Sequence, residues 1–212
     1  MRLDVYVITD PGLSRGRGHV QVVTEAIRGG ATVVQLRDKR AGGRELVEVG
    51  RALRQITREA GVLFIVNDRV DVALAVEADG VHVGQDDIPA DIARRLIGAK
   101  MILGVSVADV QEASKAKADG ADYLGIGAIY ATATKSDAGA AIGPAVIADI
   151  KRAVDLPAVG IGGINIHNAA EVIQNGADGV AVISAVVGAP DVRQATAVLV
   201  AIVEEAKRRR AS

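Results

Sequence analysis

Eight short apolar runs, most of them rich in β-branched residues, alternate along the chain with stretches that have helical spacing. Most runs are apolar at nearly every position, whereas a strand with one solvent-exposed face would be apolar at every second position. This pattern is typical of parallel strands that are buried on both faces. The runs cover residues 5–9, 32–36, 63–67, 80–84, 101–106, 123–129, 157–162 and 179–184.

The stretches between these runs repeat one unit, in which several of the predicted helices end in glycine just before the next run. Ala-Asp-Gly or Gly-Ala-Asp stands at this junction at residues 78–80, 118–120, 120–122 and 176–178. Glycine is the usual signal for a helix C-terminus. Eight such units predict an α/β fold, a (β/α)8 TIM barrel formed by residues 1–212 as a single domain. An open doubly wound sheet is the alternative; the sequence has neither a G-x-G-x-x-G turn after its first run nor a P-loop.

Composition disfavours several classes of protein. Apolar residues make up 50% of the chain and charged residues 24%, which predicts a folded domain. A net charge of −1 and a scarcity of aromatic residues disfavour a nucleic-acid binder, and the absence of cysteine excludes a disulfide framework. No signal peptide and no apolar run of about 20 residues is present, so we expect a cytoplasmic protein without a membrane partner. The basic residues 207–210 fit a solvated last helical turn better than a targeting signal.

Chemistry in TIM barrels takes place at the C-terminal ends of the strands, so polar residues at these ends are the candidates for a site. The second run ends in QLRDK, where a period of two puts Gln35, Arg37 and Lys39 on one side and Leu36 and Asp38 on the other. Two cations beside an amide suit a polyanion such as a diphosphate. For this segment alone, ordinary salt bridges at a solvated strand end explain the pattern equally well.

Carboxylates follow the third and fourth runs. Asn67 and Asp68 come directly after the third run's apolar residues, and Asp86 and Asp87 lie just beyond the fourth run. Since consecutive strands are neighbours in a barrel, Asp68 should lie close to one of these aspartates. Two carboxylates beside a cation cluster suggest Mg²⁺, held together with waters and substrate phosphate oxygens. One of Asp86 and Asp87 could instead cap the next helix, and the residues alone leave the choice open.

Histidine and serine give weaker signals. We expect His82, within the fourth run, to be a barrel-interior histidine with a hydrogen-bond partner, and we expect no chemical role for His19 or His167. Ser106 ends the fifth run, where it could face the mouth or cap the following helix. The absence of H-E-x-x-H and G-x-S-x-G motifs disfavours zinc hydrolases and serine nucleophiles.

A second anion site is predicted at the ends of the last two runs, VGIGGIN and VAVISAVVG. Glycine lets the backbone approach a ligand closely, and backbone amides there can bind anions. The loops after strands seven and eight are the recurrent phosphate site of this fold, often with a short extra helix, which SAVVG could begin. Two anion sites in one mouth suit an enzyme that joins two phosphorylated small molecules and releases diphosphate.

The ordered set QLRDK, ND, HVGQDD, GVS, TATK, GIGGI and VIS resembles thiamine-phosphate synthases over nearly the whole chain. The resemblance implies the coupling of hydroxymethylpyrimidine diphosphate to a thiazole phosphate or its carboxylated form, with Mg²⁺ required and diphosphate released. One departure is that GVS continues as VAD, where many family members have histidine or threonine nearby. We expect this difference to leave the diphosphate site unaffected.

The resemblance also implies a role for each matching residue. Arg37, Lys39 and Lys135 would stabilise the leaving diphosphate, with neither a protein nucleophile nor a general base. Asp68 and Asp87 would bind Mg²⁺. The thiazole phosphate would contact Thr132, Thr134, Gly163, Ile183 and Ser184, and the pyrimidine diphosphate would contact Gln35, Arg37, Lys39, Asn67, Ser106 and Lys135.

Three other functions are weighed against this one. A related thiazole tautomerase would need a histidine near GVS, and a Schiff-base aldolase would use Lys39 or Lys135 as nucleophile. A non-catalytic barrel could bind both phosphorylated ligands without releasing diphosphate. The segment SDAGAA beyond Lys135 is predicted to be mobile when empty and to fold over bound substrates. The oligomeric state is left open, a homo-oligomer included.

Overall fold

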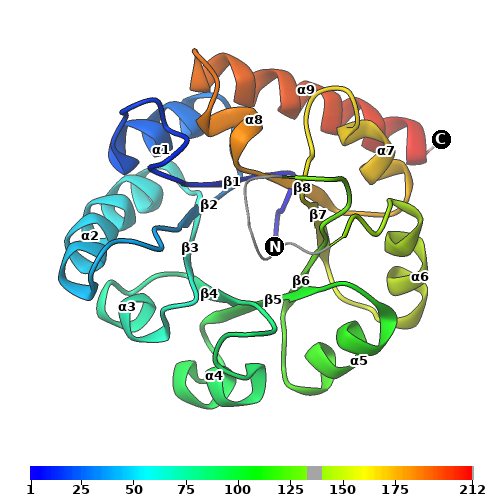
Figure 1. Ribbon diagram of the computed structural model, residues 1–212, viewed down its shortest axis with the longest axis horizontal. Helices are drawn as coiled ribbons and strands as arrows, with labels where there is room; N and C mark the ends of the chain where they lie inside the picture. Colours follow the sequence, from blue (N-terminus) through cyan, green and yellow to red (C-terminus); the bar gives the residue numbers. More distant parts are fainter. Residues whose placement is uncertain (133–139, 212) are drawn as a thin grey trace.

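The structure is a computed structural model that describes residues 1–132 and 140–211, and its strands form a closed parallel barrel inside a ring of helices (Figure 1). Each strand pairs with the next, and β8 pairs with β1 to close the barrel. The predicted (β/α)8 barrel is therefore confirmed: seven strands lie inside the predicted runs, and β5 ends one residue beyond its run. The strands are β1 Val5–Ile8, β2 Val33–Leu36, β3 Leu63–Asn67, β4 Gly80–Val83, β5 Ile102–Val107, β6 Tyr123–Ile126, β7 Ala158–Ile161 and β8 Gly179–Val182.

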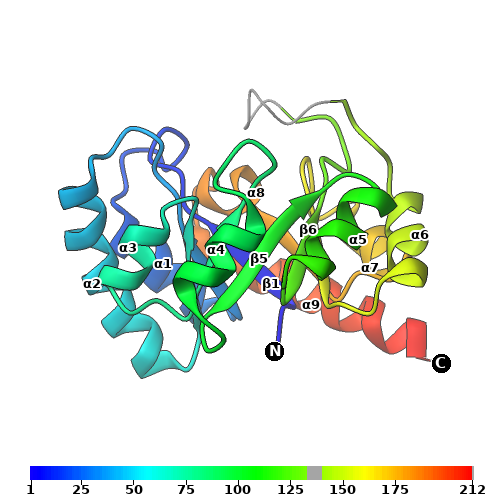
Figure 2. The ribbon, with the colours of Figure 1, turned by 90° about the horizontal axis from the view of Figure 1, so that it is seen from below.

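Within residues 1–132 and 140–211, one helix follows each of the first seven strands, and two follow the last. The extra helix is α8, which starts at Ser184 as predicted. The helices are α1 His19–Arg28, α2 Gly43–Ala60, α3 Val70–Ala75, α4 Ala90–Ile97, α5 Val110–Ala118, α6 Ala145–Ala153, α7 Ala169–Gln174, α8 Ser184–Val187 and α9 Val192–Ala211. The N-terminus lies at the opposite end of the barrel from the loops that follow the strands (Figure 2).

Strand side chains alternate between two apolar clusters. On β1, Val5 and Val7 belong to the outer cluster beneath the helices, whereas Tyr6 and Ile8 belong to the cluster that fills the barrel. A strand that is buried on both faces in this way has no solvent-facing positions. This is why the runs are apolar at successive positions.

The Ala-Asp-Gly and Gly-Ala-Asp junctions tie the strands together at the N-terminal end of the barrel. At three of them the aspartate carboxylate accepts a hydrogen bond from a backbone N–H of the preceding strand. The pairs are Phe64 N–Asp79 Oδ2, Leu103 N–Asp122 Oδ2 and Ala158 N–Asp178 Oδ2, each at 2.8 Å. Each carboxylate also pairs with a cation on the helix that comes just before the first strand of the pair. These cations are Arg54 of α2, Arg94 of α4 and Lys151 of α6.

The first strand pair has a neutral version of this contact. Val5 N donates to Thr32 Oγ1 at 3.2 Å, just before β2 begins. The same type of contact thus joins β1 to β2, β3 to β4, β5 to β6 and β7 to β8. Because these contacts lie at the N-terminal ends of the strands, they stabilise the barrel without occupying the end where the chemistry is expected.

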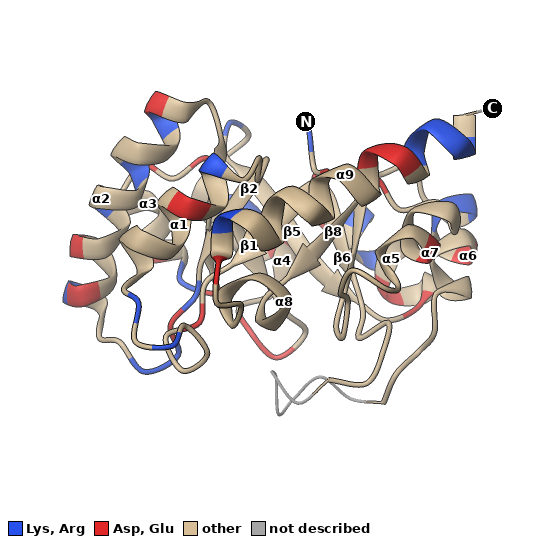
Figure 3. Ribbon diagram, turned by 90° about the horizontal axis from the view of Figure 1, so that it is seen from above, with Lys and Arg blue, Asp and Glu red and all other residues tan. Residues whose placement is uncertain are grey.

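The basic C-terminal residues belong to the last turns of α9, as predicted. Arg208 and Arg209 both pair with Glu205, and Arg210 donates to two backbone carbonyl oxygens, those of Ile173 and Ala177. Acidic and basic positions lie close together along α2 and toward the end of α9 (Figure 3). In the described part of the chain, no helix is both long and apolar enough to cross a lipid bilayer.

Candidate active site

A cavity of about 320 Å³ opens at the C-terminal ends of the strands. It brings together most of the described residues that the sequence predicted for the two anion sites. Gln35 and Arg37 are outside its lining, and Thr134 and Lys135 lie outside the described residues. The predicted residues that line the cavity are Lys39, Asn67, Asp68, Asp87, Ser106, Thr132, Gly163, Ile183 and Ser184.

The end of β2 follows the predicted alternation. Leu36 packs in the outer cluster, and Gln35 points into the barrel, where its Nε2 donates to Tyr6 Oη at 2.8 Å. Lys39 follows the strand and lines the cavity. Gln35 is therefore deeper in the barrel than a residue at the open mouth, and its side chain is 2% exposed.

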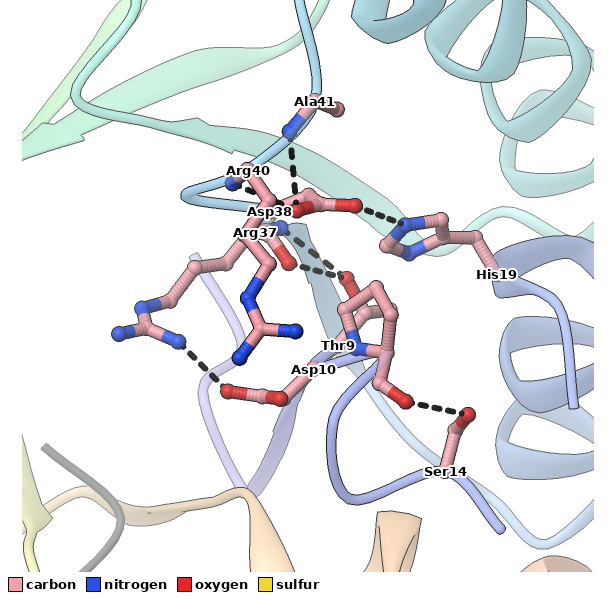
Figure 4. Close-up of polar contacts among 9 residues, drawn as sticks. Thr9, Asp10, Ser14, His19, Arg37, Asp38, Arg40 and Ala41 are labelled. Atoms are coloured by element: carbon pink, nitrogen blue, oxygen red, sulfur yellow. Dashed lines mark hydrogen bonds and ion pairs between the residues drawn. The ribbon is translucent and has the colours of Figure 1, made fainter. Parts of the chain in front are cut away.

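Arg37 forms an ion pair with Asp10, a residue of the loop after β1 (Figure 4). The Nη1 to Oδ2 distance is 2.8 Å, and the two side chains are 7% and 18% exposed. The backbone N–H of Arg37 also donates to Thr9 Oγ1 at 3.0 Å. Its Nε has no hydrogen-bond partner among the described residues. The guanidinium is therefore held in one place and retains an unused donor.

Asp38 lies on the other side of β2's extension, where it orders the turn that follows (Figure 4). Its Oδ1 accepts hydrogen bonds from the backbone N–H groups of Arg40 and Ala41, and its Oδ2 lies 3.4 Å from His19 Nε2. Burial would raise the pKa of Asp38, but these hydrogen bonds outweigh it and hold the pKa below its usual value. The carboxylate therefore stays ionised, and its hydrogen bonds hold the backbone of the turn that contains Lys39.

Asp68 has an unusual backbone conformation. Its φ is 58°, in the left-handed region that aspartate and asparagine tolerate better than most residues. Its N–H donates to the carbonyl oxygen of His82 at 2.8 Å, which fixes the turn beside β4. Asp68 and Asn67 both line the cavity. Backbone conformations of this kind often occur at functional sites, where the surrounding structure maintains them.

Asp86 and Asp87 also line the cavity, in the loop after β4. Asp87 Oδ2 accepts a hydrogen bond from Gly84 N at 2.7 Å and so orders that loop. Neither aspartate caps α4: the helix starts after Pro89 with no side-chain cap in the described structure. The capping alternative is therefore wrong, and both carboxylates remain candidates for binding a cation together with Asp68.

Ser106 and His82 contact each other at the floor of the cavity. Ser106 Oγ lies 2.9 Å from His82 Nε2, and His82 Nδ1 lies 2.9 Å from the phenolic oxygen of Tyr123. The prediction of an interior histidine with a partner is thus confirmed for His82. Ser106 does not cap α5, because the side chain of Asp109 does so by accepting from Glu112 N.

The hydrogen-bonded series continues through the barrel from Tyr123 to Tyr6. Their phenolic oxygens are 2.9 Å apart, and Tyr6 in turn accepts from Gln35. Burial raises the pKa of both tyrosines, so both keep their phenolic protons at neutral pH. The sequence analysis did not identify either tyrosine as part of this polar series.

Glycine turns after β7 form the opposite wall of the cavity. Gly162 and Gly163 have φ values of 94° and 64°, and a Cβ on Gly163 would lie 2.7 Å from the carbonyl oxygen of Ala131. Only glycine allows this close approach between the turn and the segment after β6. Ile183 and Ser184, at the start of α8, line the same wall.

The segment after β6 reaches the cavity through Thr132. Residues 133–139, with Thr134, Lys135 and most of the segment predicted to close over substrates, lie outside the described residues. Their predicted roles stay predictions.

Asp10 is the main site residue that the sequence analysis missed. It follows the first apolar run as directly as Asp68 follows the third, so the same rule would have found it. The tyrosines gave no such signal, because each lies inside an apolar run.

Comparison with known proteins identifies the family. Residues 5–186 match the family model described as thiamine monophosphate synthase. The chain is 55% identical over 204 residues to the thiamine-phosphate synthase of Moorella thermoacetica, covering 96% of this chain and 97% of the relative. It is 59% identical over 199 residues to that of Chloroflexus aurantiacus, covering 94% and 92%.

A solved structure agrees with these relatives. Thiamine phosphate pyrophosphorylase from Pyrococcus furiosus superposes with a TM-score of 0.89 at 50% identity, covering 96% of each chain. The residues matched by the family model, 5–186, include all eight strands and every residue that lines the cavity. The chain therefore belongs to the thiamine monophosphate synthase family.

Proposed function

We propose that this protein is a Mg²⁺-dependent transferase that joins a hydroxymethylpyrimidine diphosphate to a thiazole phosphate or its carboxylated form. The C–O bond between the pyrimidine methylene and the diphosphate breaks, and a bond from the thiazole nitrogen to that methylene forms. Thiamine phosphate and diphosphate are the products, with CO₂ when the thiazole is carboxylated. The observation that carries the proposal is the family match together with a single cavity that unites both candidate anion sites.

The pyrimidine diphosphate is assigned to the side of the mouth formed by β2 to β5. Arg37 and Lys39, with Lys135, supply positive charge to the departing diphosphate, and charge stabilisation of this kind is a large catalytic term. Asn67 and Ser106 line the cavity and orient the pyrimidine, and Gln35, bonded to Tyr6 below the mouth, acts through the hydrogen-bonded series that ends at Ser106. The role of Arg37 is supported by its place at the end of β2, where the ion pair with Asp10 holds its guanidinium beside the mouth.

The thiazole phosphate is assigned to the opposite wall. Gly163 and the start of α8 at Ile183 and Ser184 offer backbone N–H groups, and Thr132 and Thr134 offer hydroxyl groups. This assignment places the two substrates side by side in one cavity. Positioning two reactants in this way lowers the barrier without a protein nucleophile or general base.

Mg²⁺ fits the donor set on the pyrimidine side. Asp68, Asp86 and Asp87 line the wall to which the diphosphate is assigned, and their negative charges would repel it in the absence of a cation. Mg²⁺ is usually held by one or two carboxylates together with substrate phosphate oxygens. Asp68 and Asp87 would hold the ion, which supplies positive charge that neutralises the diphosphate when bound.

The direct test is to incubate the purified protein with both substrates and Mg²⁺ and to measure diphosphate and thiamine phosphate. Equal amounts of the two products are expected, with no diphosphate released when the thiazole phosphate is left out. Absence of thiamine phosphate from folded protein would refute the proposal. Borohydride trapping with a keto-acid phosphate tests the aldolase alternative, which requires a covalent adduct on Lys39 or Lys135.

A further inference from the structure

Five polar side chains form a continuous hydrogen-bonded series across the barrel interior. Gln35 Nε2 donates to Tyr6 Oη at 2.8 Å, and contacts of 2.9 Å then join Tyr6 to Tyr123, Tyr123 to His82 Nδ1, and His82 Nε2 to Ser106 Oγ. Tyr6 and Tyr123 are 1% and 0% exposed. Buried polar groups of this kind need a partner for every proton, because an unpaired one is costly.

Two glycines make room for this series. A Cβ on Gly104 of β5 would lie 2.2 Å from Tyr123 Cζ and 2.4 Å from His82 Nδ1. A Cβ on Gly125 of β6 would lie 3.1 Å from His82 Cε1. Both rings therefore occupy space that any larger residue on these strands would fill.

The donors and acceptors can be followed along the series. Gln35 donates to Tyr6, so the buried Tyr6 proton needs a different acceptor, and Tyr123 Oη is the one in contact with it. By the same requirement the Tyr123 proton goes to His82 Nδ1. Nδ1 is then an acceptor, so the neutral ring has its proton on Nε2 and donates it to Ser106 Oγ. Ser106 Oγ lines the cavity, and its own proton is directed away from His82.

We propose that His82 is a positioning residue that fixes the Ser106 hydroxyl as a hydrogen-bond donor to the substrate in the mouth. The inference rests on the proposed function, in which Ser106 contacts the pyrimidine diphosphate. It specifies that the substrate atom facing Ser106 is an acceptor, such as a ring nitrogen or a diphosphate oxygen. Tyr123 and Tyr6 act through His82 by holding Nδ1 as an acceptor.

The protonation pattern can be tested without turnover. In protein labelled with ¹⁵N-histidine, long-range ¹H–¹⁵N correlation spectra report which ring nitrogen bears the proton, and His82→Gln identifies the signal. We expect the proton on Nε2 in the unmodified protein and a mixture of tautomers in Tyr123→Phe. Tyr130→Phe, which removes a phenolic oxygen bonded to Glu171, is the matched control and should keep the Nε2 form.

A proton on Nδ1 and none on Nε2 would overturn the inference, because Ser106 would then donate to His82. Protons on both nitrogens would overturn the role of Tyr123, because Nδ1 would then donate to it. A Tyr123→Phe spectrum identical to that of the unmodified protein would overturn the role of Tyr123. Since this readout needs no product, it separates failure of the inference from failure of the proposed reaction.

Kinetics of two His82 variants test the consequence for the substrate. Glutamine can place an N–H near the position of Nε2, whereas asparagine reaches only the position of Nδ1. We expect kcat/KM for the pyrimidine diphosphate to fall about tenfold further in His82→Asn than in His82→Gln, the equivalent of one hydrogen bond. The KM for the thiazole phosphate should stay the same in both. Equal kcat/KM values in the two variants would contradict the proposal.

Discussion

Arg37 Nη1 lies 2.8 Å from Asp10 Oδ2, and this ion pair joins the ends of β2 and β1 at the barrel mouth. Both side chains are largely buried, so the contact is poorly screened by solvent. Arg37 also has a backbone hydrogen bond to Thr9. The strand that precedes the cation-rich segment is thus held to its neighbour by side-chain and backbone contacts together.

Removing this guanidinium should slow the reaction. We expect Arg37→Ala to lower kcat by about 10²–10³, because it removes a preorganised positive charge. Asp10→Asn should cause a smaller loss, since it frees the guanidinium but leaves it in the protein. Steady-state rates of diphosphate release measure both changes. The control is Arg58→Ala, which removes an exposed arginine at the far end of α2 and should leave the rate unchanged.

Asp68 should be required for activation by Mg²⁺. Asp68→Asn removes the charge but suits the left-handed backbone at φ 58°, so the fold should be unaffected. We expect turnover to be lost and Mg²⁺ binding in the presence of diphosphate, measured by calorimetry, to weaken. Asp87→Asn should have a similar effect and Asp86→Asn a small one. A larger loss in Asp86→Asn would assign the metal to the other aspartate.

Asp79 should stabilise the barrel without affecting catalysis. In Asp79→Ala, the buried N–H of Phe64 and the guanidinium of Arg54 lose their shared acceptor. We expect a cost of about 1–3 kcal/mol in the free energy of unfolding, seen as a lower Tm. Asp119→Ala is the matched control from another Ala-Asp-Gly sequence, where the carboxylate pairs with the exposed Lys115. A Tm loss in the control as large as in Asp79→Ala would contradict this interpretation.

Asp4 should make stability depend on pH at the acid end. Burial would raise the pKa of Asp4, but hydrogen bonds from Lys207 and Arg2 outweigh it and lower the pKa. A lowered pKa in the folded state gives stability that is complete above about pH 4, the unfolded value, and is lost as pH falls through the folded value. The Tm of Asp4→Asn should therefore lie below that of the unmodified protein at pH 7. The two Tm curves should converge in acid, and a constant gap would contradict the prediction.

Most of the fold could be predicted because a strand that is buried on both faces is apolar at nearly every position. The site was predictable where a polar residue lies at the end of an apolar run or just beyond it, as with Ser106, Asp68 and Lys39. Contacts across the barrel could not be predicted in this way. Tyr6 and Tyr123 are 117 residues apart and meet only because the barrel closes. The two possible capping roles failed for different reasons: Ser106 is in contact with His82 of the neighbouring strand, whereas Asp87 binds the backbone N–H of Gly84 in its own loop.

The hydrogen bonds at the N-terminal ends of the strands divide the barrel into four quarter-barrel modules of two strands each. Within a module, a side chain that precedes the second strand binds the backbone of the first. Between modules, neighbouring strands are joined by the backbone ladder. Inside the barrel, the hydrogen-bonded series through Tyr6, Tyr123, His82 and Ser106 links β1, β4, β5 and β6. The candidate active site is therefore assembled from the open ends of four two-strand units, each fastened at its far end, so a change in a loop at the mouth leaves these fastenings in place.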